Sequence, residues 1–162
     1  MKIKVINNSQ HSLPTYATDG SSGLDLCASF TSLDQEFKGN HFEVFNEKEV
    51  YIVLYPGGRV LIPTDLFVEI PKGYELQIRC RSGLAIKNGI SMVNCVGTID
   101  SDYRGNIGII LINHDLHTPF VIKNGDRIAQ AILNKCEKIE WNQVLKLEDS
   151  NRGTGGFGST GK

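Results

Sequence analysis

The stretch Asn106-Ile107-Gly108-Ile109-Ile110-Leu111-Ile112-Asn113 is the most apolar segment of this 162-residue chain. The apolar run at 107–112 is far shorter than the roughly 20 residues of a membrane-spanning helix. Its isoleucines suit a pleated surface better than a helix, because β-branched side chains are restricted at χ1. The same bias holds for the whole chain, in which 17 Ile and 10 Val residues greatly outnumber 5 Ala residues. The sequence therefore predicts an all-β fold.

Further short apolar segments recur on both sides of this stretch. Turn residues separate them at Pro56-Gly57-Gly58, at Pro71-Lys72-Gly73 and at 123–126, where Pro, Gly and Asn supply the required backbone angles. The segment 82–88 is compatible with a helical turn or two. Short strands at this spacing predict a jelly-roll-like β-barrel or sandwich with at most one short helix. The predicted strands are 2–6, 23–30, 50–54, 60–62, 66–70, 75–80, 107–113, 120–122 and 129–133.

The chain divides into one domain and a tail. Residues 1–149 are predicted to form a single β domain, with a polar insertion at about 31–49 that suits a surface excursion or an extra hairpin. The glycine-rich residues 150–162 are predicted to form a flexible C-terminal arm. The formal net charge of −1 gives no basic field for nucleic acid, and the N-terminus lacks the long apolar stretch of a secretory signal. We expect no nucleic-acid or membrane partner and a cytoplasmic protein, with a nuclear or virion-associated setting left open.

The four cysteines show no metal-binding pattern. Cys27, Cys80, Cys95 and Cys136 form no C-x-x-C pair and have no histidine at ligand spacing. Three of them lie in strand-like apolar stretches, which favours buried, reduced thiols. Disulfides and a zinc site are the alternatives.

A polar loop precedes the opening stretch directly. An aspartate next to a buried strand is held in place, and there it can orient and deprotonate a water molecule if it reaches the proton. Because Asp-rich turns are common, a plain polar hairpin turn is the alternative. The loop reads Asn94-Cys95-Val96-Gly97-Thr98-Ile99-Asp100-Ser101-Asp102-Tyr103-Arg104-Gly105.

A second polar group follows the predicted strand 75–80. Exposed backbone N–H groups and arginine form an anion site, to which a serine hydroxyl adds a hydrogen bond to a phosphate oxygen. The alternative is a serine that caps a helix between solvated arginines. The group reads Arg79-Cys80-Arg81-Ser82-Gly83-Leu84-Ala85.

The tail, residues 152–161, combines a cation, hydroxyl groups, flexible backbone and one aromatic ring. A nucleotide lid needs these groups, because arginine and hydroxyls bind phosphate and Phe157 stacks on a base. A flexible linker end is the alternative. Residues 156–162 also spell G-x-x-x-x-G-K, but the chain ends before the Ser/Thr and the helix that a P-loop needs, so that interpretation is rejected.

Five segments of the chain occur in the order and wording of the trimeric dUTP pyrophosphatase (dUTPase) family. Each alone is a weak match, but together they make the chain resemble this family from residue 22 to its end, with 31–49 as the main gap. The first four are Ser22-Gly23-Leu24-Asp25-Leu26, Arg81-Ser82-Gly83-Leu84-Ala85, the loop from Gly97 to Gly105, and Gly125-Asp126-Arg127-Ile128-Ala129-Gln130; the tail is the fifth.

The resemblance implies an activity and a site. The family hydrolyses dUTP to dUMP and pyrophosphate with Mg²⁺, which keeps uracil out of DNA and supplies dUMP for thymidylate synthesis. Asp100 matches the carboxylate that orients the water attacking the α-phosphorus, Tyr103 the residue beneath the deoxyribose, and Asp25 the carboxylate that holds magnesium through water. The implied substrate contacts are Asn94 and Gly97 in the uracil hairpin, Arg81, Ser82, Gly83 and Gln130 at the phosphates, and Arg152, Phe157, Gly158, Ser159 and Thr160 in the closing arm.

The resemblance further implies a homotrimer with its sites at subunit interfaces, where the tail of one chain closes a pocket built by others. Some residues depart from the family pattern. Cys80 lies where the family often has proline, and Thr154 lies where an acidic residue is usual. The insertion at 31–49 is longer than the family commonly has.

Three alternatives have different sequence requirements. A dCTP deaminase resembles dUTPase in fold, but it needs a glutamate in the third-motif region, and the sequence has none between Glu75 and Glu137. A regulatory nucleotide sensor would keep the fold without efficient turnover, and the retained Asp100 and complete tail weigh against it. A purely structural trimer would not need polar groups in five separate segments.

Overall fold

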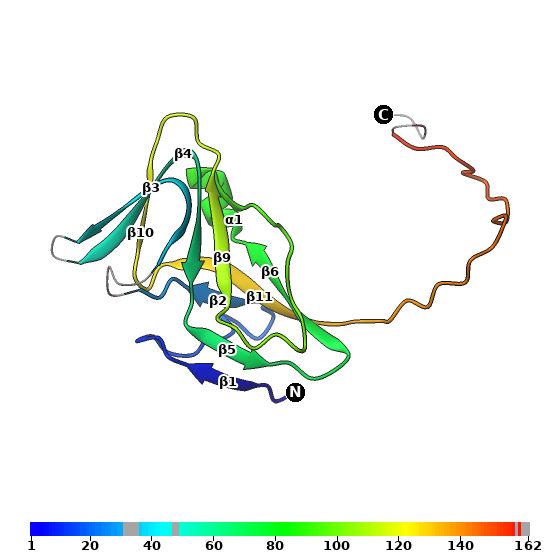
Figure 1. The fold of residues 1–162 in the computed structure, drawn as a ribbon, viewed down its shortest axis with the longest axis horizontal. Helices are drawn as coiled ribbons and strands as arrows, with labels where there is room; N and C mark the ends of the chain where they lie inside the picture. The colour runs from blue at the N-terminus through cyan, green and yellow to red at the C-terminus, as the bar shows by residue number, and fades with distance from the viewer. Residues whose placement is uncertain (31–35, 47–48, 158, 160–162) are drawn as a thin grey trace.

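The computed structural model describes residues 1–30, 36–46, 49–157 and 159, and it shows an antiparallel β-sandwich with a long C-terminal extension (Figure 1). This confirms the predicted all-β, jelly-roll-like class with one short helix, α1 (Ser82–Asn88). The first sheet has the order β10-β4-β9-β7, with β3 also paired to β4; the second has the order β2-β11-β6-β8. A separate two-stranded ribbon joins β1 to β5. The strands are β1 (Lys4–Asn7), β2 (Leu24–Cys27), β3 (Lys38–Asn46), β4 (Val50–Pro63), β5 (Leu66–Glu69), β6 (Tyr74–Cys80), β7 (Ile90–Met92), β8 (Gly97–Ile99), β9 (Gly108–Asn113), β10 (Phe120–Lys123) and β11 (Arg127–Lys135).

The core lies between the two sheets. On β9, which holds most of the apolar stretch 106–113, every second residue is buried, as the two-residue period of a strand requires. Its buried side chains join those of the other strands in one apolar cluster. The largest fully buried members are Phe30, Ile52, Leu54, Ile62, Ile78, Ile90, Ile107, Ile109, Leu111, Ile122 and Ile128.

The last residue of β9, Asn113, is a fully buried polar side chain. Its Nδ2 donates to the carbonyl oxygens of Leu54 (3.0 Å) and Thr118 (2.9 Å), and its Oδ1 accepts from the Asp115 N–H (2.9 Å). Asn113→Ala would leave these buried groups without partners, so we expect it to lower the free energy of unfolding by about 1–3 kcal/mol. Urea denaturation measures the change. The matched control is Asn8→Ala at an exposed position, expected to stay within about 0.5 kcal/mol of the parent; equal effects would contradict the assigned role.

The predicted turn at Pro56-Gly57-Gly58 is wrong, because β4 runs through it as one strand. β3 pairs with β4 on both sides of the interruption, with Asn40 opposite Arg59 and Phe42 opposite Leu54. Residues 55–58 therefore form a bulge opposite His41. A Cβ at Gly58 would collide with the carbonyl oxygen of His41, so the bulge needs glycine there. Proline and glycine mark an irregularity in a continuous strand here, and not a chain reversal.

The two other predicted turns are confirmed. The Tyr74 N–H bonds to the Pro71 carbonyl (3.1 Å), and the Asp126 N–H to the Lys123 carbonyl (3.1 Å). The helix predicted at 82–88 is confirmed as well. The three-residue strands β7 and β8 escaped prediction because they are too short to show a period.

Two further regions bear on the predicted organisation. Within the insertion at 31–49, β3 forms a hairpin with β4, while residues 31–35 and 47–48 lie outside the described residues. After β11 the chain leaves the domain as an extended segment that begins at Cys136, inside the range 1–149 assigned to the β domain (Figure 1). No helix in the described part of the chain has the length and apolar character to span a membrane.

Candidate functional site

Asp25 of β2 lies at the centre of a polar cluster on the second sheet. β11 places Gln130 opposite it in the antiparallel register and contributes Arg127 near its start. Asp25 Oδ1 accepts from Arg81 Nε (3.1 Å) and Gln130 Nε2 (3.2 Å), and Oδ2 accepts from Arg127 Nη1 (3.0 Å). Only 19% of the Asp25 side chain is exposed, so the two guanidinium groups offset the cost of burying its charge. The predicted site residues Asp25, Arg81 and Gln130 are thus brought together.

This arrangement bears on the predicted role of Asp25 in holding Mg²⁺ through water. Both carboxylate oxygens already accept hydrogen bonds, and the adjacent guanidinium groups of Arg81 and Arg127 repel a cation. Among the residues that the structure describes, no three His, Cys, Asp or Glu side chains gather into a metal-binding group. The cluster therefore does not fit a cation held by the protein. The two guanidinium groups instead suit an anionic ligand.

Ser82 and Gly83 form the first turn of α1, directly after Arg81. Both are exposed, and no heavy atom lies within 4 Å of the position that a Cβ on Gly83 would take. The helical hydrogen bonds begin with Leu84 and Ala85, whose N–H groups bond to the Arg81 carbonyl, so those of Ser82 and Gly83 precede the helical ladder. The alternative of a serine N-cap is wrong, because Arg81 occupies the cap position and its side chain forms no capping bond.

Asn94 lies in the turn between β7 and β8 and is exposed, whereas Gly97, the first residue of β8, is buried. A Cβ on Gly97 would lie 3.2 Å from Asn94 Nδ2. Glycine at this position therefore lets the asparagine amide approach the strand closely. The structure brings these two predicted uracil contacts together.

Asp100 directly follows β8 and is exposed at the start of a tight turn. The turn is closed by the Tyr103 N–H, which donates to the Asp100 carbonyl (3.2 Å), and the Tyr103 hydroxyl donates to the Asn106 carbonyl (3.0 Å). A Cβ on Gly105 would collide with the Tyr103 ring, so glycine permits this folded-back conformation. Asp100 also lines an open depression of about 670 Å³ together with Tyr74 and Asp102. The predicted site residues Asp100 and Tyr103 thus share one turn.

The structure separates this turn from the Asp25 cluster. In the β6–β8 ladder, Leu76 pairs with Ile99 and Ile78 with Gly97. Asp100 therefore lies beside the beginning of β6, whereas Arg81 follows its end, about six residues or 20 Å further along. One chain does not bring the predicted water-orienting carboxylate to the predicted phosphate site.

The part of the C-terminal arm that the structure describes stands clear of both groups (Figure 1). Phe157 is fully exposed, and Arg152 Nε donates to a nearby arm carbonyl, that of Gly155 (2.8 Å). The Ser159 N–H bonds to the Gly156 carbonyl. The predicted contacts Gly158 and Thr160 lie outside the described residues. No predicted arm contact that the structure describes reaches Asp25 or Asp100 of the same chain.

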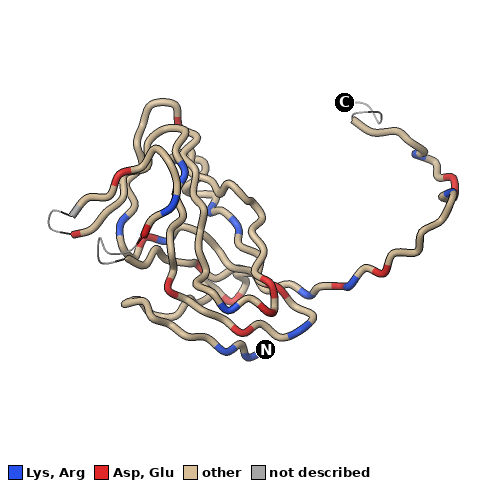
Figure 2. Tube along the Cα trace, in the orientation of Figure 1, with Lys and Arg blue, Asp and Glu red and all other residues tan. Residues whose placement is uncertain are grey.

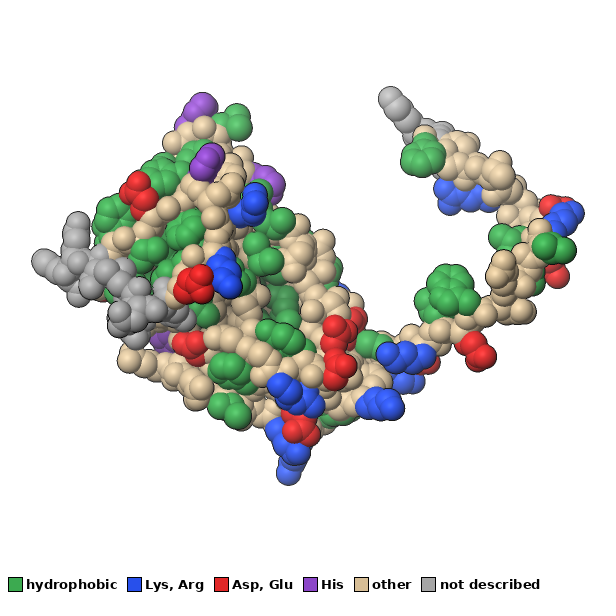
Figure 3. Space-filling view, in the orientation of Figure 1, with side chains coloured by type: hydrophobic (Ala, Val, Ile, Leu, Met, Phe, Trp, Pro, Cys, Tyr) green, Lys and Arg blue, Asp and Glu red, His purple; other side chains and the backbone are tan. Residues whose placement is uncertain are grey.

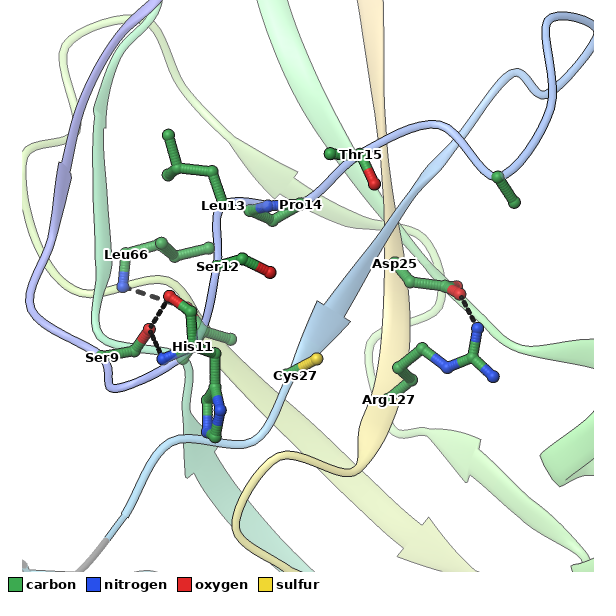
Figure 4. A pocket seen from close by; sticks show the side chains of 12 residues that line it. Ser9, His11, Ser12, Leu13, Pro14, Thr15, Asp25, Cys27, Leu66 and Arg127 are labelled. Atoms are coloured by element: carbon green, nitrogen blue, oxygen red, sulfur yellow. Dashed lines mark hydrogen bonds and ion pairs between the residues drawn. The ribbon is translucent and has the colours of Figure 1, made fainter.

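Sequence reasoning missed two contributors to the Asp25 cluster. Arg127 lies in the segment 125–130, which resembles the dUTPase family. The sequence therefore contained a signal for Arg127, although no role was predicted for it. The segment 9–15 showed no motif, yet with Asp25 and Arg127 it lines a groove of about 220 Å³ (Figure 4). His11 Nε2 lies 3.0 Å from Asn124 Oδ1, which ties this segment to the turn before β11.

The prediction of buried cysteines is wrong, although all four cysteines are free. Cys95 is exposed, and Cys27, Cys80 and Cys136 are only partly buried. Their strands end near the surface at these positions, and an apolar stretch does not show where a strand leaves the core. Burial, followed by the charge of Asp25, raises the pKa of the Cys27 thiol.

Fold and site first define a class: an antiparallel β-sandwich with separate polar groups on its surface, one of which suits an anionic ligand. Comparison with known proteins identifies the family within this class. The dUTPase family model matches residues 42–161. The deoxyuridine 5'-triphosphate nucleotidohydrolase of Finegoldia magna is 49% identical over 161 residues, which cover 99% of each chain.

Solved structures agree in fold. The dUTPase of Staphylococcus bacteriophage 80alpha with dUpNHpp has a TM-score of 0.74 at 25% identity, over 99% of each chain. The dUTPase of S. aureus phage phi11 has a TM-score of 0.69 at 23% identity, over 93% of this chain and all of the other, and this likeness concerns the fold alone. The chain belongs to the dUTPase family.

Proposed function

We propose that this dUTP diphosphatase hydrolyses dUTP to dUMP and pyrophosphate by in-line attack of a water molecule on the α-phosphorus, with Asp100 as the general base. The observation that carries this proposal is the position of Asp100. Its exposed carboxylate follows a paired strand, in a turn closed by Tyr103, beside an open depression of the surface. A carboxylate held in this way can orient a water and accept its proton.

The phosphates would bind at the Asp25 cluster. Arg81 supplies the cation, Ser82 and Gly83 supply a hydroxyl and backbone N–H groups, and Gln130 supplies an amide. Asp25 would then act by holding Arg81 and Gln130 in place through its hydrogen bonds. The substrate would be the magnesium complex of dUTP, in which the ion lowers the charge of the phosphates.

Specificity would come from two neighbouring parts of one loop. The Tyr103 ring, fixed through its hydroxyl to the Asn106 carbonyl, would lie beneath the deoxyribose and collide with a ribose 2′-hydroxyl. The turn that holds Asn94 and Gly97 would bind the uracil edge. A closed site of this kind excludes a 5-methyl group sterically and leaves the amino group of cytosine without a proper partner.

We further propose a homotrimer with its sites at subunit interfaces. The separation of Asp100 from Arg81 supports this, because a complete site then needs groups from different chains. The extended segment after β11 supports it as well, since its apolar side chains lie in solvent in the single chain (Figure 3). Packing on another subunit would bury them and bring Phe157 over that subunit's nucleotide. The exposed apolar residues of the segment are Ile139, Trp141, Val144, Leu145 and Leu147.

Subunit complementation tests the shared site. Asp100→Asn and Arg81→Ala should each be nearly inactive alone. Mixed trimers of the two variants should release pyrophosphate from dUTP at least about tenfold faster than either variant. The reason is that some sites of a mixed trimer combine an intact Asp100 with an intact Arg81. The measurement is the rate after co-refolding the two chains.

The matched control pairs Asp100→Asn with Tyr103→Ala. Both residues belong to one turn of one chain, so no mixed site can be intact and no rescue is expected. Rescue of this pair, or none for the first, would contradict the shared site.

A further inference from the structure

Two cysteines that the proposed mechanism does not use lie side by side next to the site. The Sγ atoms of Cys80 and Cys95 are 3.6 Å apart. The register of the two strands explains this, because Ile78 is the last paired residue opposite Gly97, and two positions further along the same register Cys80 comes opposite Cys95. Cβ atoms of directly opposite residues in an antiparallel pair lie about 4.5–5.5 Å apart, which places two thiols within reach of each other.

Their positions connect two segments of one chain that the proposed function assigns to substrate binding. Cys80 ends β6 and directly precedes Arg81 and Ser82, whereas Cys95 directly follows Asn94. A bond between the sulfurs would therefore link the segment proposed to bind phosphate in one site of the trimer to the turn proposed to bind uracil in a neighbouring site. Cys95 is exposed and open to a reagent in solution, and Cys80 is partly buried behind it.

We propose that Cys80 and Cys95 are a redox modification site, at which a disulfide oxidant forms a reversible intramolecular disulfide that lowers dUTP turnover. The formation of the bond stands on the geometry alone, and its effect on turnover rests on the proposed function. Close thiol pairs in reducing compartments more often sense redox state than stabilise a fold.

The reaction proceeds in two exchange steps with a small-molecule disulfide such as oxidised glutathione. The Cys95 thiolate attacks one sulfur of the oxidant, the oxidant's S–S bond breaks, and one small thiolate leaves. Cys80, deprotonated, then attacks Cys95 Sγ, the mixed disulfide breaks, and the second small thiolate leaves. The two cysteines lose two protons and two electrons, and the oxidant gains them as two thiols.

The order of attack follows from the surroundings of the two thiols. Burial raises the pKa of Cys80, and its hydrogen bond with Cys95 raises it further, which lowers the fraction of Cys80 present as the attacking thiolate. Exposure makes Cys95 the sulfur that meets the oxidant first.

The bond would displace the site. An S–S bond is about 2.05 Å long, so the sulfurs must approach by about 1.5 Å from their separation of 3.6 Å. Displacements near 1 Å in a catalytic site can cost about 10²-fold in rate. We expect the oxidised protein to lose at least about tenfold in kcat/KM for dUTP, and a reducing agent to restore it.

The test treats the reduced full-length protein with oxidised glutathione. Peptide mapping without reduction should show a Cys80–Cys95 cross-link, and pyrophosphate release from dUTP should fall and recover with dithiothreitol. Cys80→Ser and Cys95→Ser should lose the response. The matched control, a Cys27→Ser/Cys136→Ser double variant, should keep it, because it retains only the proposed pair.

Three results separate the possible failures. Glutathione attached to Cys95 without an internal cross-link would overturn the disulfide. A complete cross-link with unchanged kcat/KM would overturn its effect on the site. Reduced protein that releases no pyrophosphate from dUTP would overturn the proposed function, while the peptide map still decides whether the bond forms.

Discussion

Asp100→Asn should lower kcat for dUTP by about 10²–10⁴-fold, the usual contribution of a general base. Asparagine has the shape of aspartate and can still hold a water molecule, but it cannot accept the proton. The Asp100 turn is closed by backbone and Tyr103 hydrogen bonds that do not use the carboxylate, so the fold and the binding surface should persist. Affinity for a non-hydrolysable dUTP analogue should therefore stay within a few fold of the parent.

The two measurements are pyrophosphate release and calorimetric binding of the analogue. The matched control is Asp102→Asn, because Asp102 is an exposed carboxylate two positions away in the same turn. It should retain most of the parent activity. Near-normal turnover in Asp100→Asn would remove Asp100 from the role of base, and equal losses in both variants would show a general charge effect.

Deletion of residues 150–162 should lower kcat by about 10²-fold or more and leave thermal stability nearly unchanged. In the structure, the hydrogen bonds of the described arm residues stay within the arm, for example from the Gly153 N–H to the Ser150 carbonyl. The core of the domain therefore does not depend on the arm. Closure over the nucleotide, which excludes water and completes the site, would be lost.

Calorimetric unfolding and steady-state kinetics measure the two effects. A point variant, Phe157→Ala, should reproduce part of the kinetic loss, because its ring is fully exposed in the single chain and is free to stack on a base. A large fall in Tm after the deletion would instead make the arm a structural element.

The fold class was predictable because strand signals are local. The two-residue period of β9 and the turn residues near Pro71 and Gly125 specify strands and reversals without reference to partners. Pro56 misled the prediction because proline and glycine also occur at bulges. Only the pairing of β3 with both ends of β4 distinguishes the two cases.

The candidate site was predictable in its residues but not in its arrangement. Asp25 and Arg81 come from segments 56 positions apart, and their contact depends on the order β2-β11-β6 in the second sheet. For the same reason, the sequence did not show that two arginines form hydrogen bonds to the Asp25 carboxylate, or that the Cys80 and Cys95 side chains are in contact. Lysine and arginine are interspersed with acids along the whole trace, so net charge gave no guide to the cluster (Figure 2).

Pyrophosphate release from dUTP, dCTP, dTTP and UTP, each with Mg²⁺ and with a chelator, tests the central claim most directly. We expect dUTP with Mg²⁺ to turn over at least about 10²-fold faster than the other three nucleotides, because the uracil edge, the absent 5-methyl group and the absent 2′-hydroxyl must all fit at once. Chelation should lower the dUTP rate. Equal rates for the four nucleotides would contradict the account.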